Sequence, residues 1–317
     1  MNGRFLHIAR NTFRECLREP IFLILALTAC VLIGALPGMT LFVFREQQKL
    51  VTDSGMAATL LFGLIVAVMC AARTVAAEIR GGTSLLVLSK PVNRTVFMTA
   101  KLSGVLLATA AFWFLCSTST LIAERVATDQ FRFDLRAMSI FFASLVAGCL
   151  YGGLRNYFAQ ASFCAAAVTG LLVAVPVGAL IIRILFLTQG APGFHWELLP
   201  ALVLLLQAVL VFGAVAVAVA TRLDWTGTLI LCSAVFVVGL MSDYLIGRHA
   251  DESILAAFLY AIVPNWQLFW MADALAAEQL IPLRYVIWAS GYAALLVGLF
   301  AALASIMFSG REVGDQG

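Results

Sequence analysis

The sequence contains very little charge. Only 12% of its 317 residues are Asp, Glu, Lys or Arg, whereas about a quarter are charged in a typical soluble domain. Apolar residues make up 62% of the chain, and the mean hydropathy is +1.00. Because 20 basic and 17 acidic side chains cannot cover the surface of a soluble protein of this length, the composition excludes a soluble globule. The net charge of +3 is too small to indicate a nucleic-acid partner.

Side chains that bind metals and cofactors are also scarce. His7, His195 and His249 lie far apart, and the seven cysteines form no CxxC pair. We therefore expect no metal site and no cofactor in this chain. The sequence also lacks a G-x-x-x-x-G-K-[ST] phosphate-binding loop, so ATP and Mg²⁺ would have to be bound by another chain.

Long apolar runs dominate the rest of the sequence. A membrane span needs about 20 mostly apolar residues, and runs of this length cover 21–44, 55–77, 99–123, 137–158, 163–187, 198–220, 226–247 and 284–308. Polar residues at 155–160 separate the fourth run from the fifth, as a turn between two helices would. We predict an all-α polytopic membrane protein, a single domain over 1–317 with about eight transmembrane helices embedded in the lipid bilayer.

The basic residues predict the orientation of these spans. Eight spans place both termini on one side, and that side carries most of the Lys and Arg residues. The positive-inside rule therefore predicts an inner (plasma) membrane protein with a cytoplasmic N-terminus and a cytoplasmic C-terminus.

Residues 1–20 predict an amphipathic helix before the first span. Arg10, Arg14 and Arg18 recur every four residues and so share one face of a helix. Pro20 favours a break before the first span. The segment is either an interfacial helix or ordinary flanking charge, and both interpretations place it in the cytoplasm.

The connection between the second and third spans contains an unusual stretch, EIRGGTSLLVLSKPVNRTVFMTAK, at 78–101. Two glycines interrupt the preceding helix, Thr83 can cap a new short helix, and leucines form the apolar face of that helix. Asn93 can cap the helix that follows, and Lys101 marks the point where that helix enters lipid. The short helix could dock into a groove of another protein or pack on its own bundle, and physical arguments alone leave both open.

This stretch resembles the signature of permease subunits of ABC exporters of the second type. In that signature an acid, a Gly-Thr, a Leu-rich stretch, a Ser-x-Pro-Val turn and a basic re-entry follow in the same order. The Arg-rich N-terminal helix resembles the connecting helix of the family, and YAIVPNWQLFWMADAL at 260–275 resembles the segment before its last span.

The resemblance implies that 78–90 is a cytoplasmic coupling helix that binds a separate ATPase subunit. The implied contact residues are Glu78, Arg80, Gly82, Thr83, Leu85, Leu86 and Lys90. The common core of the family has six spans, so this chain would carry an extra pair within 137–187.

A few polar residues fall within the predicted spans. Arg183 and Asp243 lie near the outer ends of their spans, where they can reach the interface or pair with each other. Gln207 lies in the middle of its span, where it can line a pathway or, as we favour, hydrogen-bond to a neighbouring helix. Residues 251–282 are too polar for a span and suit helices at the outer interface, with Pro264 and Asn265 as their hinge.

These observations predict the transmembrane subunit of an ATP-driven ABC exporter. Its partners would be an ABC ATPase subunit and a second permease, either another copy or a related chain. The chain itself would not be an enzyme. One alternative is a mechanotransmitting or anchoring subunit that passes the work of the ATPase to a periplasmic partner. Another is an intramembrane lipid-modifying enzyme, which would need clustered catalytic side chains at membrane depth.

Overall fold

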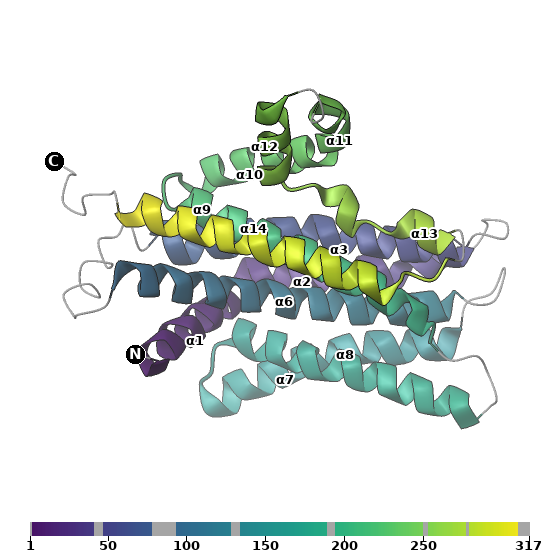
Figure 1. Ribbon diagram of the computed structural model, residues 1–317. Helices are drawn as coiled ribbons and strands as arrows, with labels where there is room; N and C mark the ends of the chain where they lie inside the picture. The colour runs from purple at the N-terminus through teal and green to yellow at the C-terminus, as the bar shows by residue number, and fades with distance from the viewer. Residues whose placement is uncertain are drawn as a thin grey trace.

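The computed structural model describes residues 2–40, 47–77, 93–127, 134–188, 194–249, 253–276 and 279–309. Within these ranges the chain forms twelve α-helices and no β-strand. Seven helices are long and apolar enough to cross a membrane, and a bent pair raises the number to as many as eight. The predicted all-α, multi-span architecture is therefore confirmed (Figure 1).

The membrane-length helices follow the predicted apolar runs. They are α2 (Pro20–Met39), α3 (Gln47–Ala71, continued by a π-helical turn at Ala72–Ala76), α6 (Arg94–Val126), α7 (Leu135–Ala159), α8 (Phe163–Thr188), α9 (Leu199–Ala220) and α14 (Leu283–Ser309). Two starts differ from prediction: α3 begins at Gln47 rather than at 55, and α6 at Arg94 rather than at 99. Polar residues at a span end can continue the helix without being apolar, so hydropathy underestimates helix length.

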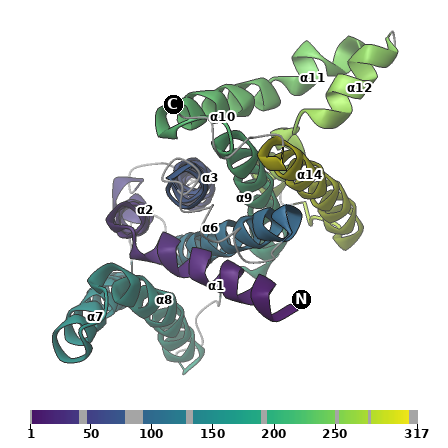
Figure 2. The same ribbon diagram turned by 90° about the vertical axis from the view of Figure 1, so that its left-hand side faces the viewer.

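The core of the bundle contains α3, α6 and α9 (Figure 2). In the most apolar stretches of α3 and α9, 72% and 78% of residues are buried inside the protein, compared with 22% in α14. α14 contacts α9 and α6 from the outside. Since α14 is apolar but mostly uncovered by protein, its outer face is suited to contact with lipid.

The predicted extra pair forms an antiparallel hairpin, α7–α8, at one side of the bundle (Figure 2). The chain reverses at Gln160, which has a left-handed φ of 51°. The two helices approach so closely that a Cβ added to Gly148 would lie 2.8 Å from the backbone nitrogen of Leu171. The predicted turn between the fourth and fifth spans is thus confirmed.

The predicted span at 226–247 is not straight. It consists of α10 (Trp225–Leu240), α11 (Ser242–Leu245) and a 3₁₀ turn at Gly247–His249, with a bend of 68° after α10. With α12 (Ile254–Ile262), these elements form an arm that extends away from the bundle (Figures 1 and 2). We refer to 225–262 as the arm.

Side chains satisfy the backbone carbonyls that the bend frees. Ser242 Oγ donates to the carbonyl oxygen of Gly239 at 3.0 Å. Gln267 Nε2 donates to the carbonyl oxygen of Leu240 at 2.9 Å. Because backbone carbonyls freed from a helix need other hydrogen-bond donors, these bonds are compatible with a sharp bend at this position.

α1 (Asn2–Arg18) lies across one end of the bundle, next to the start of α6 (Figure 2). We call this the α1 end, and the opposite end, where α3 and α9 begin and α6 finishes, the far end. Glu19 separates α1 from α2 with an extended backbone, and Pro20 begins α2. The predicted helix break at Pro20 is confirmed.

Candidate functional site

The predicted docking residues Glu78, Arg80, Gly82, Thr83, Leu85, Leu86 and Lys90 lie outside the described residues. The structure describes both flanks of 78–92. The π-helical turn Ala72–Ala76 precedes this segment, and Asn93 follows it. Asn93 Oδ1 accepts a hydrogen bond of 3.0 Å from the backbone N–H of Thr95, so Asn93 caps α6 as predicted. The candidate site is therefore the α1 end, where these flanks meet α1.

α1 has the two faces that its sequence predicts. Arg10, Arg14 and Arg18 are all exposed. The buried residues of the opposite face are Ala9, Thr12, Cys16 and Leu17. α1 is therefore packed on the bundle through its apolar side and presents a row of guanidinium groups on its other side.

Gly104 of α6 determines how closely α1 packs. A Cβ added there would lie 2.6 Å from the carbonyl oxygen of Ala9 and 2.6 Å from Cβ of Thr12. These distances are shorter than van der Waals contact, so glycine is required for α1 to cross α6 at this position.

Lys101 joins three elements at the α1 end. Its Nζ lies 3.6 Å from Oε2 of Glu15 in α1 and donates a 3.0 Å hydrogen bond to the carbonyl oxygen of Thr74 in the π-helical turn. The side chain of Lys101 is only 3% exposed. The Glu15 carboxylate and the Thr74 carbonyl supply the close acceptors that a buried ammonium group needs. That Lys101 marks the entry of α6 into lipid stays a prediction.

A second ion pair joins the same turn to the junction of α1 and α2. Arg73 Nε lies 3.6 Å from Glu19 Oε2, with 53% and 30% of the two side chains exposed. Such an exposed pair contributes little stability by itself. Like the Lys101 contact, however, it connects the π-helical turn to the region of α1. π-helical turns inside α-helices frequently occur at functional sites. Both flanks of 78–92 are thus joined to α1 by charged side chains.

The polar residues predicted within the spans have separate partners. Gln207 Nε2 donates to Ser290 Oγ at 2.6 Å and so joins α9 to α14, in agreement with the interpretation we favoured. The guanidinium carbon of Arg183 lies 5.0 Å from the ring centre of Trp196. Asp243 accepts hydrogen bonds from Tyr260 and Asn265 instead. Arg183 and Asp243 therefore do not pair with each other, because their helices lie on different sides of the bundle (Figure 2).

The predicted hinge at Pro264 and Asn265 lies between α12 and a 3₁₀ turn at Trp266–Phe269, after which α13 (Ala272–Ala276) follows. Asn265 is 2% exposed, and its Nδ2 donates to Asp243 Oδ1 at 2.7 Å. The Tyr260 hydroxyl donates to the same oxygen at 2.6 Å, and this bond raises the pKa of Tyr260 above its ordinary value. These hydrogen bonds therefore hold α11 and α12 of the arm to Asn265.

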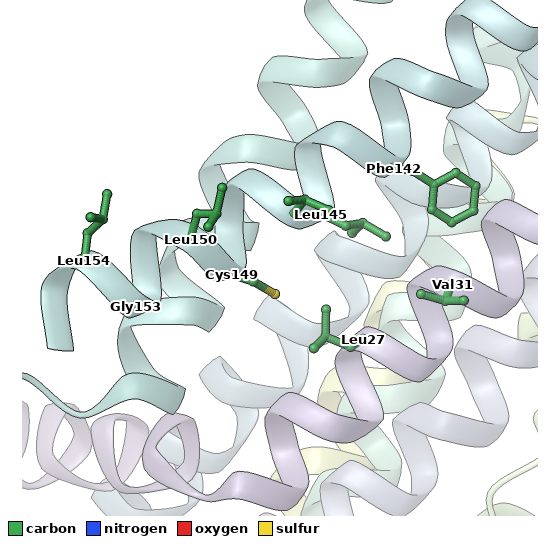
Figure 3. Close-up of a pocket in the computed structure, with 9 residues that line it drawn as sticks. Leu27, Val31, Phe142, Leu145, Cys149, Leu150, Gly153 and Leu154 are labelled. Carbon is green, nitrogen blue, oxygen red and sulfur yellow. The ribbon is translucent and has the colours of Figure 1, made fainter. Parts of the chain in front are cut away.

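An apolar groove of about 550 Å³ lies between α2 and α7 (Figure 3). Its lining residues are Leu27, Val31, Phe142, Leu145, Val146, Cys149, Leu150, Gly153 and Leu154. Figure 3 shows side chains of both helices bordering the same hollow. Since none of these side chains carries a charge, the groove is suited to apolar groups.

Sequence reasoning missed two sets of residues. One is Glu15 and Glu19 at the α1 end, which pair with Lys101 and Arg73. The other, at the far end, includes Glu124 and His195, which are 71 residues apart and in direct contact. Contacts between residues so distant in the chain leave no local pattern, and only the lone charges at span ends could have indicated them.

Comparison with known protein families finds no family whose pattern this chain matches, and comparison with curated proteins finds no match either. Apolar helices of membrane length are therefore the firm basis for classification. The chain is a multi-pass, all-helical integral membrane protein with seven to eight candidate spans.

Proposed function

We propose that this chain is the transmembrane subunit of an ATP-driven ABC exporter of the second type, and that residues 78–90 dock a separate ATPase subunit. The observation that supports this most is the set of contacts made by Lys101. It connects α1 and the turn before 78–92 to α6, which begins directly after that segment. Because close-packed elements move together, a displacement of 78–90 would reach α1, α3 and α6 at the same time.

In this proposal the docking helix contributes contacts of two kinds. Leu85 and Leu86 fill an apolar cleft of the ATPase, next to Gly82 and Thr83. Glu78, Arg80 and Lys90 make polar contacts at the rim, where charge complementarity determines partner choice. The resemblance of 78–101 to the exporter signature supports these roles.

The energy source lies outside the chain. ATP and Mg²⁺ bind to the ATPase subunits, and a second permease, identical or related, completes the membrane part. Both termini and the α1 end face the cytoplasm of the inner (plasma) membrane. ATP-driven closure of two ATPases would bring two docking helices together and switch the membrane helices between inward-open and outward-open or collapsed states.

A matched pair of proline substitutions tests the docking. Leu86→Pro breaks the proposed docking helix, whereas Leu280→Pro changes an exposed leucine in an irregular segment before α14. We expect Leu86→Pro and Glu78→Ala to abolish stimulation of ATP hydrolysis, and Leu280→Pro to keep it, with membrane insertion unchanged in all three. Normal stimulation in the Leu86→Pro variant would contradict the proposal.

Transport is distinguished from mechanical transmission by a second measurement. Inverted vesicles that contain the complex should accumulate a labelled substrate when ATP is added. ATP hydrolysis without accumulation would instead indicate that the work passes to a periplasmic partner.

A further inference from the structure

A second pocket, of about 630 Å³, lies between the bundle and the arm. Its walls come from α3, from α10 and from the segment that follows the hinge at Pro264 and Asn265. Binding sites for small molecules typically have volumes of about 300–1,000 Å³ and combine an apolar lining with a few polar groups. The groove between α2 and α7 has no charged side chain, whereas this pocket has one.

Two helices form the apolar wall of the pocket. α3 contributes Ala57, Leu60 and Leu61, and α10 contributes Phe236 and Leu240. The apolar run of α3 begins at 55, so its contribution lies in roughly the first two turns of that run. Because α3 begins at the far end, the pocket lies where the far end passes into the apolar part of the bundle.

The segment after the hinge forms the polar wall. Gln267, Trp270 and Asp273 all line the pocket, at intervals of three residues. Gln267 is tied to the end of α10 through its 2.9 Å hydrogen bond to the carbonyl oxygen of Leu240. Ala272 is 4% exposed and packs in a cluster of side chains from α3 and α9. The polar wall is therefore held in place by contacts that do not involve the carboxylate of Asp273.

Asp273 gives the pocket a negative charge that the protein does not neutralise. Within the described ranges its side chain makes no ion pair and accepts no hydrogen bond, and no Lys or Arg lines the pocket. A carboxylate beside apolar surroundings attracts a cation, because the opposite charge favours its ionised form. The ring of Trp270 adds a second attraction, since the faces of aromatic rings bind cations. An anionic ligand would be repelled.

We propose that this pocket binds a cationic amphiphile with a quaternary ammonium head group. The head group lies against Asp273 and Trp270, and the hydrocarbon chain lies along the wall that α3 and α10 form. Quaternary ammonium groups are recognised by aromatic faces and negative charge, and they need no hydrogen-bond acceptors. The ligand can enter from the lipid, because Leu61 and Leu240 are 55% and 40% exposed. This inference is independent of the proposed exporter function.

Photolabelling of the full-length protein in uncharged maltoside micelles tests the pocket. The probes are dodecyltrimethylammonium with a diazirine in its chain and dodecanol with the same diazirine, and mass spectrometry locates the labelled residues. We expect the cationic probe alone to label 57–61 and 236–240 saturably. Asp273→Asn should raise its half-saturating concentration about two- to fivefold, the factor that one exposed charge contact supplies. Glu197→Gln removes an exposed acid at the same end and should leave the labelling unchanged.

Leu61→Trp tests the location of the site independently of its charge. The larger side chain should fill the pocket and abolish saturable labelling, and the exposure of Leu61 allows the change without repacking of the core. Both probes should label the uncharged groove between α2 and α7 equally in all variants. Saturable labelling that survives Leu61→Trp, or equal affinity in wild type and Asp273→Asn, would overturn the proposal. Equal saturable labelling by the neutral probe would also overturn it and assign the pocket to uncharged lipid chains.

Discussion

α1 and the arm both run at an angle to the long helices of the bundle (Figures 1 and 2). They are attached to the bundle in different ways. α1 buries a continuous face and is joined to neighbouring elements through Glu15. In the arm, α10 buries only Thr228, Cys232 and Gly239 among its residues, and Ile254 of α12 is 92% exposed. α1 is therefore part of the packed core, whereas the arm contacts the bundle through α10 but buries few of its own residues.

This difference shows how a helix that crosses one end of the bundle can be coupled to the membrane-length helices. At the α1 end, charged groups are paired across elements, so movement of one element must disturb the others. In the arm, α10 packs on α9 through Phe236, which contacts Phe212, and a hydrogen-bonded cluster around Asn265 holds the remainder. Many other apolar side chains of the arm are exposed and suit lipid. Mechanical coupling should therefore be strong at the α1 end and weak in the arm.

The largest effect is expected from Lys101→Glu, which removes the charged connection of α6 to α1 and the π-helical turn. It places a carboxylate against Glu15 and the carbonyl oxygen of Thr74, and breaking a buried charge contact costs about 3–5 kcal/mol. Thermal unfolding of the detergent-solubilised protein measures the loss. Arg284→Glu, at an exposed position of α14, is the control, and an equal loss in both variants would contradict the structural role of Lys101.

Asn265→Ala should release the arm. The substitution removes the hydrogen bonds that the buried Asn265 amide donates to Asp243 and Tyr260, at a cost of about 1–3 kcal/mol. Amide hydrogen exchange should become faster in 254–262 and stay unchanged in α1. Asn11→Ala, which removes an exposed bond to Glu15, should leave exchange in the arm unaffected. Unchanged exchange in Asn265→Ala would show that the arm is held elsewhere.

Gly104→Ala tests the close approach of α1 to α6. Overpacking of this kind costs about 1–3 kcal/mol. Gly291→Ala in α14 is the matched control, since a Cβ there meets nothing within 4 Å, and removing a helix glycine stabilises by about 0.5–1 kcal/mol. Opposite shifts in unfolding temperature are expected. A stabilising effect in both variants would argue against tight packing of α1.

We expect the smallest effect from Ser290→Ala. Ser290 lies in α14, outside both α1 and the arm, so its loss of stability is a reference for the other variants. It removes the bond between Gln207 and Ser290 that joins α9 to α14, and such bonds in membranes contribute about 0.6 kcal/mol. A double-mutant cycle with Gln207→Leu measures this coupling energy. A value as large as the loss in Lys101→Glu would contradict the view that the α1 end holds the strongest connections.

The sequence was sufficient to predict the spans, the faces of α1, the turn near Gln160 and the helix break at Pro264 and Asn265, because each depends on local periodicity or on a local helix break. It was not sufficient for the 68° bend after α10, which depends on Gln267 reaching back to Leu240. The contacts of Lys101 and the contact between Glu124 and His195 were also missed. Each joins residues that become neighbours only after distant helices pack, so no spacing rule could have found them.

Photo-crosslinking from the coupling segment tests the central claim most directly. A photoreactive amino acid replaces Leu86 in the full-length protein within its own membrane, and the same amino acid replaces Leu280 in a control. The account predicts a crosslink from position 86 to a nucleotide-binding ATPase subunit, and none from position 280. Crosslinks from position 86 only to lipid or to this chain itself would contradict the account.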